Sequence, residues 1–189
     1  MTLDVIDHLA AIAPGSSLSA LRDVRREARE QAQASYRALF EPAETADMSL
    51  PERHAVATFT AGLHHDSAIA GFYGATLPDA AIIAAEAARG RGQGPYGAYP
   101  RGKLSAEDSP GPLYHAANPA LSRRLAAALD HTHMLVFHPR DATPEALQAL
   151  LDAGWSTTGI VTLSQLVAFL AFQIRVVSGL RVLSATGVQ

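Results

Sequence analysis

Residues 49–77 read SLPERHAVATFTAGLHHDSAIAGFYGATL, and two helical patterns meet in this stretch at a polar corner. Ser49 and Glu52 are spaced to form a capping box, in which the hydroxyl accepts from a backbone N–H three residues on and the carboxylate reaches back. At the corner, Asp66 is placed to cap the second pattern. The stretch therefore predicts two helices joined by a short turn, with the other helices of the chain arranged around them.

The rest of the chain shows helical periodicity in its apolar residues. Proline, glycine and capping residues mark the starts and ends of the helices. Alternating apolar patterns and hairpin turn signals, which would indicate strands, are missing from the sequence. Leu18, Leu21 and Val24 begin an apolar stripe that we expect to be buried. The sequence therefore predicts an all-α fold, with further helices over 3–13, 17–40, 79–89, 118–137, 144–153 and 157–184.

A glycine- and proline-rich stretch, residues 90–112, interrupts this helical chain. Its composition predicts irregular structure, and a loop of this length in a compact domain is usually functional or disordered. Tyr96, Tyr99 and Arg101 suit either a lid over a site or an ordered arm against another subunit. We favour the arm.

The last predicted helix, residues 157–184, carries apolar residues around nearly its whole circumference. Such a helix is buried within the chain or covered by another subunit, so we expect a homo-oligomer. The alternative is that the N-terminal helices, residues 3–40, cover it within one chain. A membrane span is not expected, because Gln165, Gln173 and Arg175 interrupt a stretch shorter than the ~20 apolar residues required.

The composition excludes several classes of function. The net charge is −3 and long basic runs are absent, so binding to nucleic acid or to a membrane surface is not expected. The chain has no cysteine, which excludes disulfides, thiolate metal sites and thiol catalysis. Asp4 and Asp7 interrupt the first apolar stretch, so we expect no signal peptide, and the predicted location is the cytoplasm.

Two stretches resemble the alkylhydroperoxidase D-like / carboxymuconolactone decarboxylase superfamily, in particular its peroxidase-related branch. They are the central stretch and DATPEALQALLDAGWSTTGIVTLSQLVAFLAFQIRVVSGLRVL at 141–183. The resemblance covers roughly residues 45–184 and implies an all-helical bundle that assembles into dimers, trimers or hexamers. It divides the chain into an N-terminal helical arm, residues 1–44, and one compact domain, residues 45–189. We expect no cofactor.

The catalytic motif of that family is substituted at every matching position. The family has a glutamate, then a Cys-x-x-Cys pair that opens a helix, then a histidine one turn later. Here His54 stands at the glutamate position, Asp66 and Ile69 stand at the cysteine positions, and Tyr73 stands at the histidine position. Because the peroxide-reducing cycle needs a thiolate and a resolving thiol, we expect no thiol peroxidase (peroxiredoxin) activity.

The candidate catalytic cluster consists of His64, His65 and Asp66, with His54 about three helical turns upstream. Histidine transfers protons near neutral pH, and a neighbouring carboxylate orients it. The cluster predicts a thiol-free acid/base enzyme for a small organic substrate, with lactone decarboxylation as the most concrete form. The ordinary alternative for the corner is a solvated turn with a capping aspartate. The alternative function is a non-catalytic binding or scaffold subunit, which could pair with a cysteine-containing homologue.

A second group of histidines, His131, His133 and His138, lies in the predicted helix 118–137 and just beyond its end. Residues two apart do not share a helix face, so we expect His131 and His133 to diverge. We therefore interpret these three as structural or surface histidines, and we expect no metal site.

Overall fold

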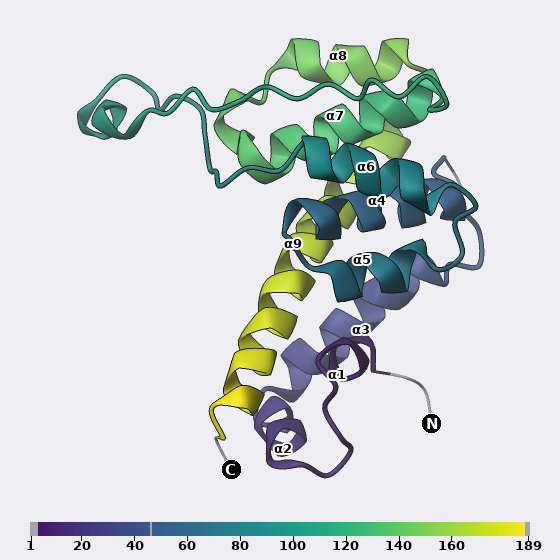
Figure 1. The fold of residues 1–189 in the computed structure, drawn as a ribbon, viewed down its shortest axis with the longest axis vertical. Coiled ribbons are helices and arrows are strands. Elements are labelled where there is room, and N and C mark those ends of the chain that lie inside the picture. The colour runs from purple at the N-terminus through teal and green to yellow at the C-terminus, as the bar shows by residue number, and fades with distance from the viewer. Residues whose placement is uncertain (1–3, 46, 188–189) are drawn as a thin grey trace. The chain divides into compact units, whose positions relative to one another are not determined.

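The computed structural model describes residues 4–45 and 47–187 (Figure 1). Within these ranges the chain forms α-helices and short 3₁₀ helices, and its only β-type pairing is an isolated bridge between Gly97 and Ser109. The predicted all-α class is thus confirmed. The elements are α1 (Val5–Leu9), α2 (Ser17–Asp23), α3 (Arg26–Phe40), α4 (Leu50–Leu63), α5 (Ser67–Gly74), α6 (Ala80–Arg89), η1 (Lys103–Glu107), α7 (Arg123–Phe137), η2 (Pro139–Asp141), α8 (Pro144–Asp152) and α9 (Thr157–Ala185).

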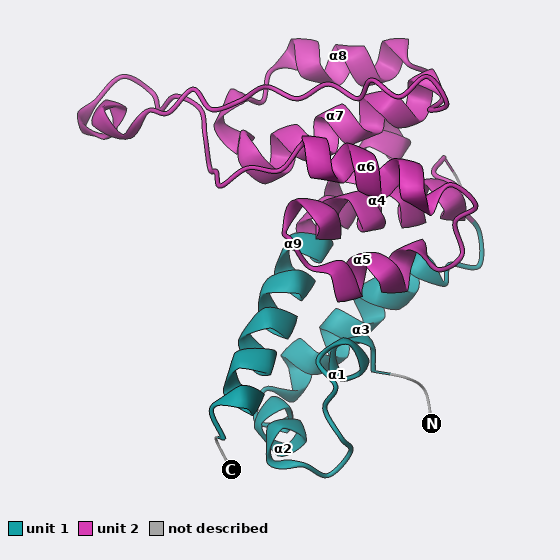
Figure 2. Cartoon of the chain, viewed as in Figure 1, with its two compact units in different colours: residues 1–44, 169–189 teal, residues 45–168 magenta. Residues whose placement is uncertain are grey.

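The chain forms two compact units (Figure 2). Unit 1 comprises residues 1–44 and 169–189, and unit 2 comprises residues 45–168. The division after residue 44 falls where the sequence places the end of the N-terminal arm. The second division falls inside α9, whose C-terminal part belongs to unit 1. There the guanidinium of Arg181 donates to the carbonyl of Leu9 over 2.8 Å.

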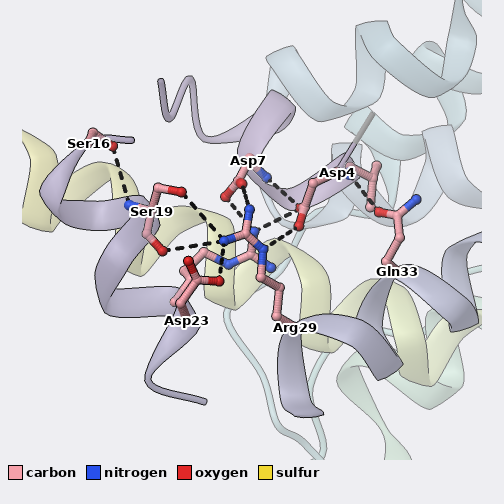
Figure 3. Close-up of polar contacts among 9 residues, drawn as sticks. Asp4, Asp7, Ser16, Ser19, Asp23, Arg29 and Gln33 are labelled. Carbon is pink, nitrogen blue, oxygen red and sulfur yellow. Dashed lines mark hydrogen bonds and ion pairs between the residues drawn. The ribbon is translucent and has the colours of Figure 1, made fainter. Parts of the chain in front are cut away.

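A cluster of ion pairs holds the N-terminal helices of unit 1 together (Figure 3). Arg22 of α2 and Arg29 of α3 each bind both Asp4 and Asp7, with 2.8 Å between Arg22 Nη1 and Asp4 Oδ1. Burial alone would raise the pKa of Asp4, but hydrogen bonds from Asp7 N–H and Arg22 leave that pKa below its ordinary value. The carboxylates are therefore held charged between two arginines.

The predicted single helix over residues 17–40 is wrong, because α2 ends at Asp23 and α3 begins at Arg26. The break allows arginines from both helices to reach the same pair of carboxylates. It also removes the predicted continuous apolar stripe. Leu18 is buried, whereas Leu21 is 48% exposed and Val24 is 79% exposed.

In unit 2, α4 contacts α5, α6 and α7 and is buried along most of its length. Its predicted capping box is present, with Ser49 N–H donating to Glu52 Oε2 over 2.8 Å and the Ser49 hydroxyl accepting from Glu52 N–H. The absence of a side chain at Gly62 allows close approach to α6, since a Cβ there would lie 2.6 Å from the Cβ of Ala87. Small residues on α4 and α6 thus permit the tight packing at the centre of the unit.

Capping residues account for the starts of the later helices. The hydroxyl of Thr143 caps α8, and that of Ser156 accepts from Gly159 N–H at the start of α9. The predicted start of α7 at residue 118 is wrong, because the helix begins at Arg123 with Ser122 as its cap. The backbone N–H of Asn118 instead donates to Glu86 of α6.

The helix α9 is 29 residues long, with a mean hydropathy of 1.9 in its most apolar window. By length and composition it is the one helix among the described residues that could cross a membrane. Our expectation that its polar residues leave too short an apolar stretch is therefore wrong. Core helices of water-soluble proteins have the same properties, and 44% of that window is buried. The helix is therefore weak evidence for a membrane segment.

The stretch 90–112 is irregular apart from η1 and the bridge between Gly97 and Ser109, as predicted. Tyr96 N–H donates to the carbonyl of Phe137 at the end of α7. The residues between the two bridge partners, including η1, extend away from the helices of unit 2 (Figure 1). The use of this stretch as an arm stays a prediction.

Candidate functional site

The corner between α4 and α5 gathers three of the four predicted site residues. His64 is the C-terminal cap of α4, and Asp66 is the N-terminal cap of α5, where its carboxylate accepts from Ile69 N–H over 2.9 Å. His65, between them, is exposed and has a φ of 60°. These three residues therefore form the turn itself.

The fourth predicted residue, His54, lies earlier on α4. Its Nδ1 is 2.9 Å from the carbonyl oxygen of Tyr73, and the two rings are in edge contact. His54 of α4 therefore contacts α5 near the C-terminal end of that helix. A catalytic role for the four residues stays a prediction.

A cavity of about 310 Å³ lies in unit 2 between α7, α8 and the segment 113–115. We call it the α7–α8 cavity; its described lining includes none of His54, His64, His65 and Asp66. Part of the lining is apolar and consists of Leu113, Ala127, Met134, Ala146, Ala149 and Leu150. The polar part consists of Tyr114, His115, Asp130, His131, His133, His138 and Asp141.

The helix α7 supplies one continuous wall, because residues three and four apart lie on the same face. Ala127, Asp130, His131 and Met134 follow that spacing. His133 also borders the cavity, although its Nε2 binds the carbonyl of Gly90 at 2.9 Å.

The predicted divergence of His131 and His133 is thus seen in their partners, Ser164 and Gly90. Both also line the same cavity as His138, which their spacing did not indicate, and their interpretation as structural or surface histidines stays a prediction. The segment 113–115 closes that cavity from a distant part of the sequence.

A buried carboxylate on α6 fixes this segment. Glu86, 3% exposed, accepts from the hydroxyl of Tyr114 over 2.7 Å and from the N–H of Asn118 over 2.9 Å, and it forms an ion pair with Arg89. Burial, followed by the hydrogen bond to Glu86, raises the pKa of Tyr114 well above its ordinary value. Tyr114 is therefore a neutral donor that holds the cavity wall against α6.

His138 ties the same wall to the end of α7. Its Nε2 lies 2.9 Å from the carbonyl oxygen of Pro112, and its Nδ1 lies 2.9 Å from Asp141 Oδ2. Both partners are hydrogen-bond acceptors, so both ring nitrogens are engaged within the protein. The ring is 3% exposed.

His115 and Asp130 form a pair at the edge of the cavity. His115 Nδ1 lies 3.3 Å from Asp130 Oδ2, and Asp130 Oδ1 accepts from Ala116 N–H over 2.6 Å. Burial raises the pKa of Asp130, and this effect outweighs the lowering by its two hydrogen bonds. A carboxylate that receives Nδ1–H leaves Nε2 of the imidazole as a proton acceptor.

His131 is buried on α7 and contacts Ser164 of α9. Its Nε2 lies 3.4 Å from the hydroxyl oxygen of Ser164, while its Nδ1 is buried and has no hydrogen-bond partner among the described residues. Burial lowers the pKa of His131, and burial is also the main cause of the lowered pKa of His133. Both rings are therefore neutral near pH 7.

Among the described residues, no group of three or more histidine and carboxylate side chains is placed to hold a metal ion. The arrangement is a cavity with apolar and polar walls and a histidine–carboxylate pair at its edge.

Our reading of the sequence missed Tyr114, His115, Asp130 and Asp141. One signal was available, since four of the eight histidines lie between residues 115 and 138.

Comparison with known proteins adds no relative: neither the models of protein families nor the curated proteins gave a match.

Proposed function

We propose that the protein is a thiol-free acid/base enzyme that acts on a small organic molecule in the α7–α8 cavity. The observation that carries this proposal is the His115–Asp130 pair beside an apolar cavity of about 310 Å³. The carboxylate orients the ring, and Nε2 accepts a proton from the bound molecule. Cavities of this size commonly hold small ligands.

We also propose that the chain is a member of the alkylhydroperoxidase D-like / carboxymuconolactone decarboxylase superfamily. The all-α fold and the pair of helices α4 and α5 are consistent with that resemblance. Since the chain has no cysteine, this membership does not extend to thiol peroxidase chemistry. Of the three corner residues, only Asp66 stands at an active-site position of the family, and the cavity supplies the better site for a ligand.

A second candidate is a non-catalytic binding subunit, alone or with a cysteine-containing homologue. The observation that favours it is the exposure of His115, whose side chain is 81% accessible to solvent. A base in contact with water lacks the water-excluded surroundings that strengthen electrostatic catalysis.

Base-catalysed ring opening of a nitrobenzisoxazole tests the first candidate, because the reaction reports a positioned general base. Removing such a base costs about 10²-fold or more, so His115→Ala should lower kcat/KM by about that factor. His65→Asn is the matched control, since asparagine tolerates the left-handed backbone of that position. Activity no greater than that of free imidazole, or equal activity in His115→Ala, would favour the non-catalytic candidate.

We further propose a homo-oligomer in the cytoplasm. On α9, Phe172 is 47% exposed and Val182 is 60% exposed, which leaves apolar side chains for an interface. A cysteine-free chain is compatible with a reducing compartment. Light scattering should give a multiple of the chain mass, and Phe172→Asp should reduce it without unfolding the chain. The mass of one chain for the unaltered protein would exclude the oligomer.

A further inference from the structure

The charged side chains that line the α7–α8 cavity disfavour the binding of a carboxylic acid. Among the described residues that line it there is neither lysine nor arginine, while two carboxylates, Asp130 and Asp141, border it. The side chains of these two aspartates are 36% and 41% exposed. A bound carboxylate would therefore face two like charges and find no permanent cation among the described lining residues.

The hydrogen-bond donors of the lining are already used within the protein. The Tyr114 hydroxyl donates to Glu86, and His133 Nε2–H donates to the carbonyl of Gly90. The two ring nitrogens of His138 face Pro112 O and Asp141. These side chains therefore have no further donor to offer a ligand.

Acceptors for a ligand remain on His115 and on the two carboxylates. The hydroxyl of Ser164 donates to Ile160 O over 2.9 Å, so its oxygen accepts from His131 Nε2 and leaves His131 Nδ1 as an acceptor. That nitrogen is buried and has no hydrogen-bond partner among the described residues, so it exposes no surface to a ligand in the cavity. His115 donates from Nδ1 to Asp130, which leaves its Nε2 as an acceptor. The lining is thus rich in acceptors and poor in donors.

We propose that the α7–α8 cavity binds an apolar amine or alcohol and rejects carboxylic acids of the same size. This names the substrate class of the proposed function and rests on its choice of site. The ligand supplies the N–H or O–H that the lining lacks, and its apolar body contacts Met134, Leu150 and the alanines of α7 and α8. An acid offers only acceptors, so its oxygens would lose water without gaining a partner.

The charge states of the buried histidines support the same selectivity. Burial lowers the pKa of both His131 and His133, so neither ring supplies a positive charge to an anion near neutral pH. The ring of His138 is already paired with Asp141, 2.9 Å from its Nδ1. A hydrogen-bond donor that is missing or misplaced is a strong source of discrimination between ligands of equal shape.

Calorimetric titration with benzylamine, benzyl alcohol and benzoate tests the inference, because the three probes share one ring and differ in the polar group. We expect both donors to bind, with benzylamine at least tenfold tighter than benzoate. Asp130→Asn should weaken benzylamine about tenfold, the usual scale for one charged hydrogen bond. Asp79→Asn is the matched control, because Asp79 is exposed and makes no side-chain capping bond.

The ranking of the three probes on the unaltered protein needs no variant, so it stands even if Asp130→Asn misfolds. The inference would be overturned if benzoate bound as tightly as benzylamine. It would also be overturned if neither benzylamine nor benzyl alcohol bound. Selective binding of the donors without any proton-transfer activity would contradict the proposed enzyme but uphold the inference. Proton transfer on a neutral probe together with preferred binding of benzoate would contradict the inference but uphold the proposed enzyme.

Discussion

The two histidine clusters of this protein, at the α4–α5 corner and around the α7–α8 cavity, use their polar atoms differently. At the corner, the residues are neighbours in sequence, and Asp66 accepts from the backbone N–H that begins α5. Around the cavity, residues from three segments surround a space of about 310 Å³. The corner residues, adjacent in sequence, thus form a turn. The residues that line the cavity come together only in the folded chain.

The clusters also differ in their support. The wall of the cavity depends on Glu86, a buried carboxylate with partners in three separate residues. The corner depends on a helix cap whose residues are exposed or half-buried. We therefore expect substitutions in the support of the cavity to cost far more stability than substitutions at the corner.

The largest effect is expected for Glu86→Ala. It leaves the Tyr114 hydroxyl and the Asn118 N–H without their acceptor, and each buried unsatisfied group costs about 1–3 kcal/mol. Urea denaturation should show a loss of about 3 kcal/mol in the free energy of unfolding. Calorimetric titration should show that the variant no longer binds benzylamine. Glu86→Gln keeps an acceptor oxygen and should lose less. Equal stability of the Ala variant and the unaltered protein would mean that the cavity wall is held by other contacts.

The second effect concerns pH and separates His131 from His65. Burial lowers the pKa of His131 below its ordinary value of 6.5. The unfolded chain therefore binds the proton first as pH falls, and the folded state loses stability below about pH 6.5. This loss continues down to the folded-state pKa, with a limit of about 1.4 kcal/mol per pH unit for one group.

The measurement is urea denaturation at several pH values between neutrality and about pH 5. His131→Gln should flatten the fall in the free energy of unfolding, and it should do so more than His65→Gln, because His131 is buried and His65 is exposed. Asp130, whose pKa is raised, contributes with the opposite sign, so the comparison with each variant isolates the histidine. Equal slopes in His131→Gln and the unaltered protein would contradict the burial of a neutral ring.

Local signals allowed much of the fold to be predicted. The capping boxes and hydroxyl caps at Ser49, Thr143 and Ser156 act over three residues, so the sequence displays them directly. The break between α2 and α3 was missed, and the ion pairs that it allows join Arg22 to Asp4 and Asp7, which lie 15 or more residues away in the sequence. Helix periodicity carries no information about such contacts.

The site was harder to predict than the fold for the same reason. His115 lies in an irregular segment, and its partner Asp130 lies 15 residues later on α7. Spacing on a helix correctly separates the partners of His131 and His133, but it does not reveal that a third segment closes a cavity over both. Glu86, 28 residues before Tyr114, is one of the groups that hold this segment, together with Asp130 and His138.

The smallest effect is expected at the corner, for Asp66→Ala. This change removes the acceptor for Ile69 N–H at the start of α5, and the loss of a cap costs about 1 kcal/mol. Asp66→Ser keeps a capping oxygen but removes the carboxylate, so it should recover most of the stability. In both variants we expect probe binding and proton transfer to remain within twofold of the unaltered protein. If Asp66→Ser keeps its stability but loses activity, the carboxylate has a chemical role, and the predicted site at His64, His65 and Asp66 would displace the cavity as the catalytic centre.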